Sequence, residues 1–171
     1  MAIRDIVFYP DPILRETCQT VEEIDEETLA LLDDLGASMY AHKGVGLAAP
    51  QIGSTARAVV VDVEQREGTP RLVELVNPEL VEVSEELSEF EEGCLSFPGE
   101  SELVTRPARV VVRALGRDGE QLEIEADGIL ATALQHELDH LEGTLFIDHI
   151  SRLKRSMIER RMKKRARRAA S

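Results

Sequence analysis

Aromatic residues are scarce in this chain. Phe, Tyr and Trp together make up 4% of its 171 residues, and Trp is absent, while 43% of the residues are hydrophobic. Aliphatic side chains must therefore fill the core, and the length suits one domain. No apolar run approaches the roughly 20 residues that span a bilayer. The N-terminus lacks the basic start and the apolar stretch of a signal peptide. We expect a cytoplasmic protein with no membrane partner.

Cysteine is also rare, with only Cys18 and Cys94. They could pair as a disulfide. In a cytoplasmic chain, however, a cysteine is more often a buried hydrophobic residue, a metal ligand or a nucleophile.

Basic residues are few over most of the chain and crowded at its end. The chain holds 20 Lys and Arg against 33 Asp and Glu. Ten of the 20 lie between Arg152 and Arg168, where Glu159 is the only acid. We divide the chain into a main domain over residues 1–150 and a basic tail over residues 151–171. Such a tail indicates either a polyanionic partner or a solvated helix that packs on the acidic body.

Hydrophobic periodicity predicts the main elements. Apolar residues at helical spacing indicate a helix from Asp25 to about His42, and a second helix runs from an N-cap at Asp127 to about Leu141. Strands are expected over 56–63, 72–76, 80–83, 109–115 and 121–125, with Asn77-Pro78 as a turn. The tail is expected to be a basic helix. Strands precede the second helix and do not alternate with helices, so the predicted class is α+β with mostly antiparallel sheets wrapped around a central buried helix.

The strongest motif is His136-Glu-Leu-Asp-His140 on that central helix. Positions four apart lie on one helix face, so both imidazoles can bind one metal ion, and Glu137 can reach a water at the ion. Apolar residues occupy more than one side of the helix, which is typical of a buried helix. One apolar stripe is formed by Leu130, Leu134, Leu138 and Leu141, and the other by Ile129, Ala133, His136 and His140.

A catalytic metal needs a third protein ligand and an open position. Upstream, Cys94 lies in an irregular segment between Gly93 and Pro98 and could supply a thiolate. Downstream, the chemically suitable side chains are Glu142, Asp148, His149 and Glu159. Thiolate and imidazole ligands suit Zn²⁺ or Fe²⁺ and argue against Mg²⁺ or Ca²⁺.

Three segments together resemble the peptide deformylases. They are Gly44-Val-Gly-Leu-Ala-Ala-Pro-Gln51, then Glu92-Gly-Cys-Leu-Ser96, then Gln135-His-Glu-Leu-Asp-His140. The resemblance covers essentially the whole chain. It implies removal of the formyl group from N-formylmethionyl nascent chains. It also implies one divalent metal ion per chain, Fe²⁺ in the cell, with Zn²⁺ or Ni²⁺ able to occupy the site.

The resemblance also implies roles for individual residues. Cys94, His136 and His140 would bind the metal, and Glu137 would be the general base and acid. The side-chain amide of Gln51 and the backbone N–H of Leu95 would bind the oxyanion. Substrate would be bound by Gly46, Val45, Ile129, Thr132 and Ala133, of which Thr132 and Ala133 would line the pocket for the methionine side chain. The ligands would be held in place by Glu92, Arg106 and Asp139.

Three other interpretations stay open at this point. A zinc endopeptidase would use a downstream third ligand in place of Cys94. A metal-stapled domain without catalytic activity would add Cys18 as a fourth ligand and bind RNA or the ribosome through its tail. Gly44-x-Gly46-x-x-Ala49 also fits a dinucleotide fingerprint. That motif requires a preceding strand and a following helix, which the predicted elements do not supply, so we expect no nucleotide cofactor.

Overall fold

The computed structural model describes residues 2–170, apart from the side chain of Arg66. Within that range the helices are α1 Glu26–Ala41, α2 Gly128–Leu141 and α3 Arg152–Ala170. The strands are β1 Gly46–Ala48, β2 Ala58–Val61, β3 Val73–Val83, β4 Leu87–Gly93, β5 Ser101–Pro107, β6 Arg109–Leu115 and β7 Gln121–Asp127. Short 3₁₀ helices lie at Pro12–Arg15, Ala49–Ile52, Gln65–Glu67 and Phe146–His149. The predicted α+β class is confirmed.

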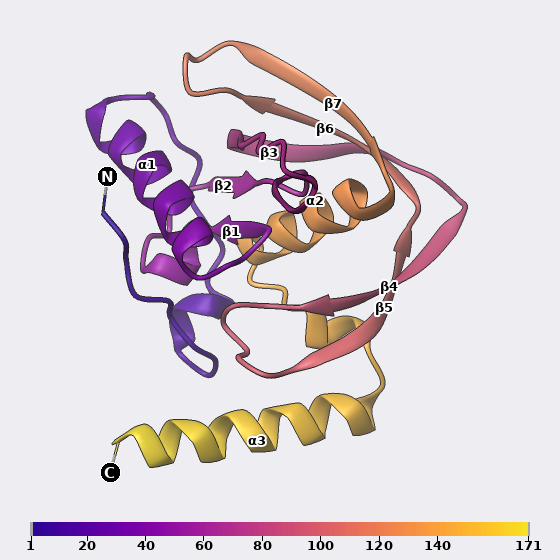
Figure 1. Ribbon diagram of the computed structural model, residues 1–171. Helices are drawn as coiled ribbons and strands as arrows, with labels where there is room; N and C mark the ends of the chain where they lie inside the picture. The colour runs from indigo at the N-terminus through magenta and orange to yellow at the C-terminus, as the bar shows by residue number, and fades with distance from the viewer. Residues whose placement is uncertain (1, 171) are drawn as a thin grey trace.

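Two antiparallel sheets enclose α2. One has five strands in the order β1-β2-β3-β6-β7, and the other is the β4–β5 hairpin. Figure 1 shows α2 in the middle of the molecule, with the larger sheet above it and the hairpin below it. Helix α2 contacts strands of both sheets. Ten of its 14 residues are buried, so it is the central helix that the sequence predicts.

Helix α1 covers one end of the larger sheet. The Asp25 carboxylate accepts a hydrogen bond from the backbone N–H of Thr28 at 3.0 Å, which caps the helix close to its predicted start. Leu32, Leu35 and Met39 are fully buried in one cluster with residues of β1 and β2. The loop from α1 to β1 is thereby held against the sheet.

The predicted turn at Asn77-Pro78 is wrong. Strand β3 is continuous from Val73 to Val83, and its register against β6 shifts between Val76 and Glu79. Asn77 has a φ of 51°, and its side chain exchanges hydrogen bonds with the backbone of Val21. A bulge accommodates a proline that cannot donate to the ladder, so the chain keeps its direction.

The β4–β5 hairpin is absent from the sequence prediction. Five of the 14 residues in its two strands are charged, and a single face is buried, through Glu92, Val104 and Arg106. Two buried charged residues conceal the alternation of apolar and polar residues that usually reveals a strand. The segment carrying Cys94 therefore follows a strand directly.

The ends of α2 depart in detail from the prediction. Asp127 occupies the N-cap position, but its side chain makes no capping hydrogen bond. Ile129 is 61% exposed, so the second apolar stripe does not extend to the first turn. Gly143 follows the end of the helix, with a φ of 71°. A Cβ at Gly143 would lie 2.4 Å from the backbone oxygen of Arg15, so only glycine fits there.

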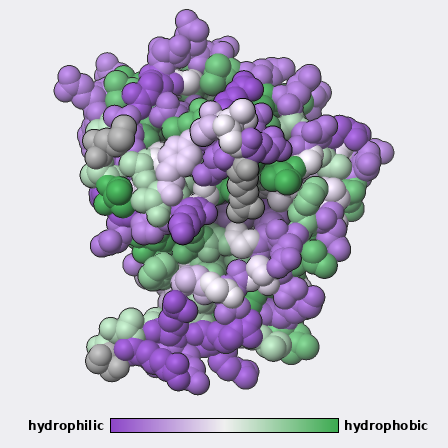
Figure 2. All heavy atoms as spheres, viewed as in Figure 1, coloured by the Kyte–Doolittle hydropathy of each residue, from purple (hydrophilic) through white to green (hydrophobic). Residues whose placement is uncertain are grey.

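Helix α3 is the predicted basic helix. Figure 2 shows it as a band of mostly hydrophilic side chains along the lower edge of the molecule. Only Ile158 and Met162 are buried, and they join a cluster that contains Tyr9 and Phe97. Among residues 2–170, no helix combines the length and the apolar character that crossing a bilayer requires.

Candidate active site

The buried centre of α2 presents the predicted ligand pair. His136 and His140 lie one turn apart, with their ring centroids separated by 5.1 Å. They are 8% and 1% exposed, and Glu137 beside them is 4% exposed. The helical spacing therefore places two imidazoles and a carboxylate at one point inside the protein, as the motif predicts.

Cys94 completes a group of three. It follows the last residue of β4, and its Sγ lies 3.5 Å from Nε2 of His140. The sulfur and one nitrogen from each of His136 and His140 all lie within 4.8 Å of one another. Tetrahedral coordination at ordinary bond lengths separates a thiolate sulfur from an imidazole nitrogen by roughly 3.5 Å. The three side chains therefore have the spacing of a metal site.

The hairpin also supplies a buried ion pair behind the histidines. Nδ1 of His136 lies 2.9 Å from Oε1 of Glu92. The guanidinium of Arg106 donates to both oxygens of Glu92, at 2.6 and 2.9 Å, and to Asp139 at 2.8 Å. This arrangement fixes the ring of His136 and leaves its Nε2 for a metal. The three residues expected to hold the ligands in place thus lie together.

The surroundings of the two histidines shift their pKa values in opposite directions. Burial alone would raise the pKa of Glu92, but hydrogen bonds with Arg106 and His136 lower that pKa to about 2. Burial alone would lower the pKa of His136, but hydrogen bonds with Cys94 and Glu92 raise it well above its ordinary value. Burial and the neighbouring His136 lower the pKa of His140 well below its ordinary value. The surroundings of His136 therefore suit a cation, and His140 is a neutral imidazole that can bind one.

Two buried polar atoms at this point have no hydrogen-bond partner within the described part of the chain. They are Oε1 of Glu137 and Nδ1 of His140. Burial raises the pKa of Glu137 to about 7. Glu137 thus takes no part in the ion pairs around Glu92. Its unpaired Oε1 can accept a proton in the centre of the site. These residues therefore suit a bound metal ion.

Other candidate ligands are engaged elsewhere. Cys18 lies in a separate cluster of the core, where burial raises the pKa of its thiol to about 11. Of the downstream candidates, Asp148 pairs with Arg15, His149 with Asp139, Glu142 with Arg57, and Glu159 with Tyr9. Among the described residues, only Cys94, His136 and His140 form a group with the spacing of metal ligands. Both the endopeptidase and the four-ligand interpretation therefore lose their metal site.

The glycine segment passes directly over Glu137. A Cβ at Gly46 would lie 2.5 Å from Oε2 of Glu137, so a larger residue would displace the carboxylate. A Cβ at Gly44 would lie 2.8 Å from the side chain of Leu95, on the segment after Cys94. The segment follows α1 and leads through the short strand β1 into a 3₁₀ helix. It therefore lacks the strand-to-helix context of a dinucleotide fingerprint.

Gln51 turns its amide toward the metal group. Its Oε1 accepts the backbone N–H of Ala48 at 3.0 Å, which orients the side chain. Its Nε2 lies 3.1 Å from Oγ of Ser96 and 3.4 Å from Sγ of Cys94. Ser96 is fully buried and is a positioning partner that the sequence analysis did not identify, although the cysteine motif includes it.

His149 is the second residue that the sequence analysis did not assign. Its Nε2 lies 2.8 Å from the same oxygen of Asp139 that Arg106 contacts. Nothing in the spacing of His149 indicates this contact, because it depends on the turn at Phe146–His149 folding back on α2.

A pocket of about 530 Å³ is lined by Cys94 and His136 of the three-residue group and by Glu137. Its walls are formed by the glycine segment, by the end of β4 with the segment around Cys94, and by α2. All five predicted substrate-binding residues line it, namely Val45, Gly46, Ile129, Thr132 and Ala133. The exposed Ile129 belongs to the mouth of this pocket, which explains why an apolar residue of α2 faces solvent.

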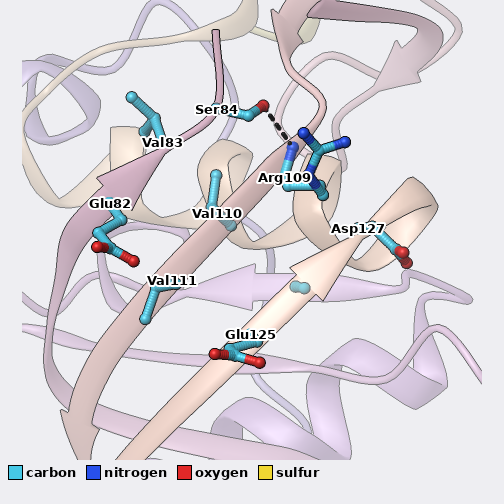
Figure 3. A pocket seen from close by; sticks show the side chains of 9 residues that line it. Glu82, Val83, Ser84, Arg109, Val110, Val111, Glu125 and Asp127 are labelled. Atoms are coloured by element: carbon cyan, nitrogen blue, oxygen red, sulfur yellow. Dashed lines mark hydrogen bonds between the residues drawn. The ribbon is translucent and has the colours of Figure 1, made fainter. Parts of the chain in front are cut away.

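A second cavity, of about 680 Å³, lies on the larger sheet. Figure 3 shows its lining side chains on neighbouring strands, including Glu82 on β3, Arg109 on β6 and Glu125 on β7. Both glutamates are exposed, and Arg109 pairs with Glu86. None of the metal-spaced residues lines this cavity, so the smaller pocket is the candidate active site.

Comparison with known proteins identifies the family. The family model for polypeptide deformylase matches residues 3–156. A peptide deformylase of Agrobacterium fabrum is 51% identical over 169 residues, with 98% of each chain covered. A crystal structure of a peptide deformylase from Legionella pneumophila superposes with a TM-score of 0.90 at 45% identity, covering 99% of this chain and 98% of that one. One from Ehrlichia chaffeensis in complex with actinonin gives 0.91 at 38% identity, covering 96% and 98%. The resemblance read from three short motifs is therefore confirmed over nearly the whole chain, which belongs to the polypeptide deformylase family.

Proposed function

We propose that this chain removes the N-formyl group from the formyl-methionyl end of nascent polypeptides. The observation that carries the proposal is the convergence of Cys94, His136 and His140 beside an unpaired buried Glu137. Three protein ligands leave a position open for water, as hydrolysis requires. A divalent ion held there would acidify water and polarise the formyl oxygen.

The proton transfers are assigned to Glu137. As general base, its carboxylate takes the proton of the attacking water, and as general acid it then passes that proton to the departing amine. Its unpaired oxygen and its position under Gly46 support both roles.

The oxyanion of the tetrahedral intermediate is assigned to two donors. One is the amide of Gln51, which is already directed at Cys94, and the other is the backbone N–H of Leu95, the residue next to Cys94. Each such donor contributes about 3 kcal/mol to lowering the barrier.

The substrate is placed in the pocket of about 530 Å³. Its backbone lies along Val45 and Gly46, which both line the pocket. Its methionine side chain enters between Ile129, Thr132 and Ala133. Glu92 holds His136 from behind, and Arg106 links Glu92 to Asp139.

The metal is assigned as Fe²⁺ in the cell, with Zn²⁺ or Ni²⁺ also accepted, because one thiolate and two imidazoles suit all three ions. We also propose that the protein is cytoplasmic, because its proposed substrates are chains leaving the ribosome.

The decisive assay is formate release from formyl-methionyl peptides by protein loaded anaerobically with iron. Glu137→Ala should keep its metal and lose about 10³-fold in kcat. Glu142→Ala is the matched control, because that acid at the end of the same helix pairs with Arg57 outside the site. If the wild-type protein holds metal but releases no formate, the proposed function is wrong.

We also propose that α3 contacts the ribosome. Arg160, Lys163, Lys164, Arg165 and Arg167 are exposed on it, and five cations suit phosphate contacts. Charge substitutions test this better than deletion does, because Ile158 and Met162 of α3 are buried in the core. Replacing Lys163, Lys164 and Arg167 with glutamine should weaken ribosome co-sedimentation and flatten its dependence on salt. Unchanged co-sedimentation at low salt would rule the contact out.

A further inference from the structure

The segment after Cys94 forms one wall of the substrate pocket, and α3 packs against the outer side of this segment. Phe97 lies in that wall and is 1% exposed. It stacks on Tyr9 with ring centroids 5.0 Å apart, and it shares a cluster with Ile158 and Met162 of α3. The wall therefore rests on α3, although α3 itself does not line the pocket.

The last residue of this wall is a carboxylate that α3 neutralises. Glu100 lines the pocket, and Arg161 of α3 holds it through three contacts of 2.7, 2.9 and 3.2 Å. The Glu100 side chain is only 13% exposed, whereas that of Arg161 is 52% exposed. The pair therefore presents little net charge to a bound peptide.

The other charged groups that line the pocket do not neutralise Glu100. Glu92 is neutralised by Arg106, and Glu137 lies at the reacting centre. Glu91 is exposed and accepts a hydrogen bond from the Ser101 hydroxyl. Lys43 lines the opposite side. Releasing Glu100 would therefore add one negative charge to an otherwise balanced rim.

We propose that Arg161 is a specificity-determining positioning residue: by clamping Glu100, it keeps the pocket wall neutral toward charged substrate residues that follow the formyl-methionine. The inference rests on the proposed deformylation of such peptides and assigns α3 a role in choosing among them. Without the clamp, the freed carboxylate attracts a cationic residue and repels an anionic one.

A competition assay tests the clamp. Wild type and Arg161→Gln are each given equal amounts of two formylated peptides that differ only in carrying Lys or Glu. One pair carries the charge at the second residue, and another carries it at the third. The ratio of the two consumption rates equals the ratio of the kcat/KM values. It is independent of how much enzyme is folded or loaded with metal.

In Arg161→Gln the preference for Lys over Glu should rise about 3-fold in at least one pair, the size expected of one partly exposed charge. Arg161→Lys keeps the cation and should resemble wild type. Adding Glu100→Gln to Arg161→Gln removes both charges and should restore the wild-type ratio.

Lys154→Gln is the matched control. It removes one charge from the same helix and breaks an ion pair to the same hairpin, at 3.0 Å from Glu102, which does not line the pocket. It should leave the ratio unchanged. If Arg161→Gln leaves both ratios at the wild-type value, or if Lys154→Gln shifts them equally, the inference is wrong. Failure of the proposed function would appear separately, as a wild type that consumes neither peptide.

Discussion

Helices α2 and α3 are opposite in character. Ten of the 14 residues of α2 are buried, whereas only two residues of α3, which spans 19, are buried. In α2, burial removes His136, Glu137 and His140 from water, so the charge of each residue depends on its neighbours. In α3 the charged side chains stay at the surface, where some of them form ion pairs with the body of the protein, and two apolar residues anchor the helix. The contrast teaches that one fold buries the helix that carries the metal-spaced residues and leaves solvated the helix that supports the pocket wall.

The largest effect on this comparison is expected from removing Cys94, the predicted metal ligand that the β4–β5 hairpin brings to α2. Cys94→Ala should lose its bound metal and all measurable formate release, because two imidazoles alone do not hold the ion. Cys18→Ala, in the separate core cluster, should keep stoichiometric metal. Metal analysis of the purified variants measures both. Metal retained without Cys94, or lost without Cys18, would show that the site is assembled differently.

A smaller effect is expected from the support behind α2. Glu92→Gln removes the charge that fixes His136 and pairs with Arg106, while it keeps the shape of the side chain. Metal affinity should fall about 10- to 100-fold, measured by competition with a chelator. Glu91→Gln changes the exposed neighbour and should leave metal affinity unaltered. Equal affinities in the two variants would mean that the carboxylate of Glu92 does not act through the ligand.

The smallest effect concerns α3, where the comparison predicts changes in stability without loss of chemistry. Met162→Ala empties a site that is 1% exposed and should lower the free energy of unfolding by about 2–3 kcal/mol. Met157→Ala, at 46% exposure on the same helix, should change it by less than about 0.5 kcal/mol. Urea unfolding of the metal-loaded protein measures both. Equal costs would mean that α3 does not anchor through Met162.

Sequence patterns located the site more accurately than they located the strands. The His136–His140 spacing is local, so one helix places both ligands whatever surrounds it. The segment around Cys94 was identified, but its strand was not, since Glu92 and Arg106 occupy inward positions where apolar residues are expected. Charged residues can face inward there because each satisfies the other, which only the folded pairing of β4 with β5 reveals.

The ion-pair network shows the same limit. Glu92, Arg106 and Asp139 were expected near the ligands because of the family resemblance. Their contacts, and that of His149 with Asp139, arise from segments that meet only after folding. The bulge at Asn77 is comparable, because its hydrogen bonds to Val21 come from a distant part of the chain.

The amino-acid sequence by itself indicated the family, predicted the ligand set and the base, and showed the basic character of the last helix. The histidine pair, Glu137 and the basic run depend on residue types at short spacings, which local backbone geometry converts directly into position, whereas Cys94 was assigned through the family resemblance. Tertiary structure decided which wall of the pocket rests on α3, which charges are neutralised and which of the two cavities faces the ligands. Those properties depend on burial and on distances between remote segments, and neither is contained in local spacing.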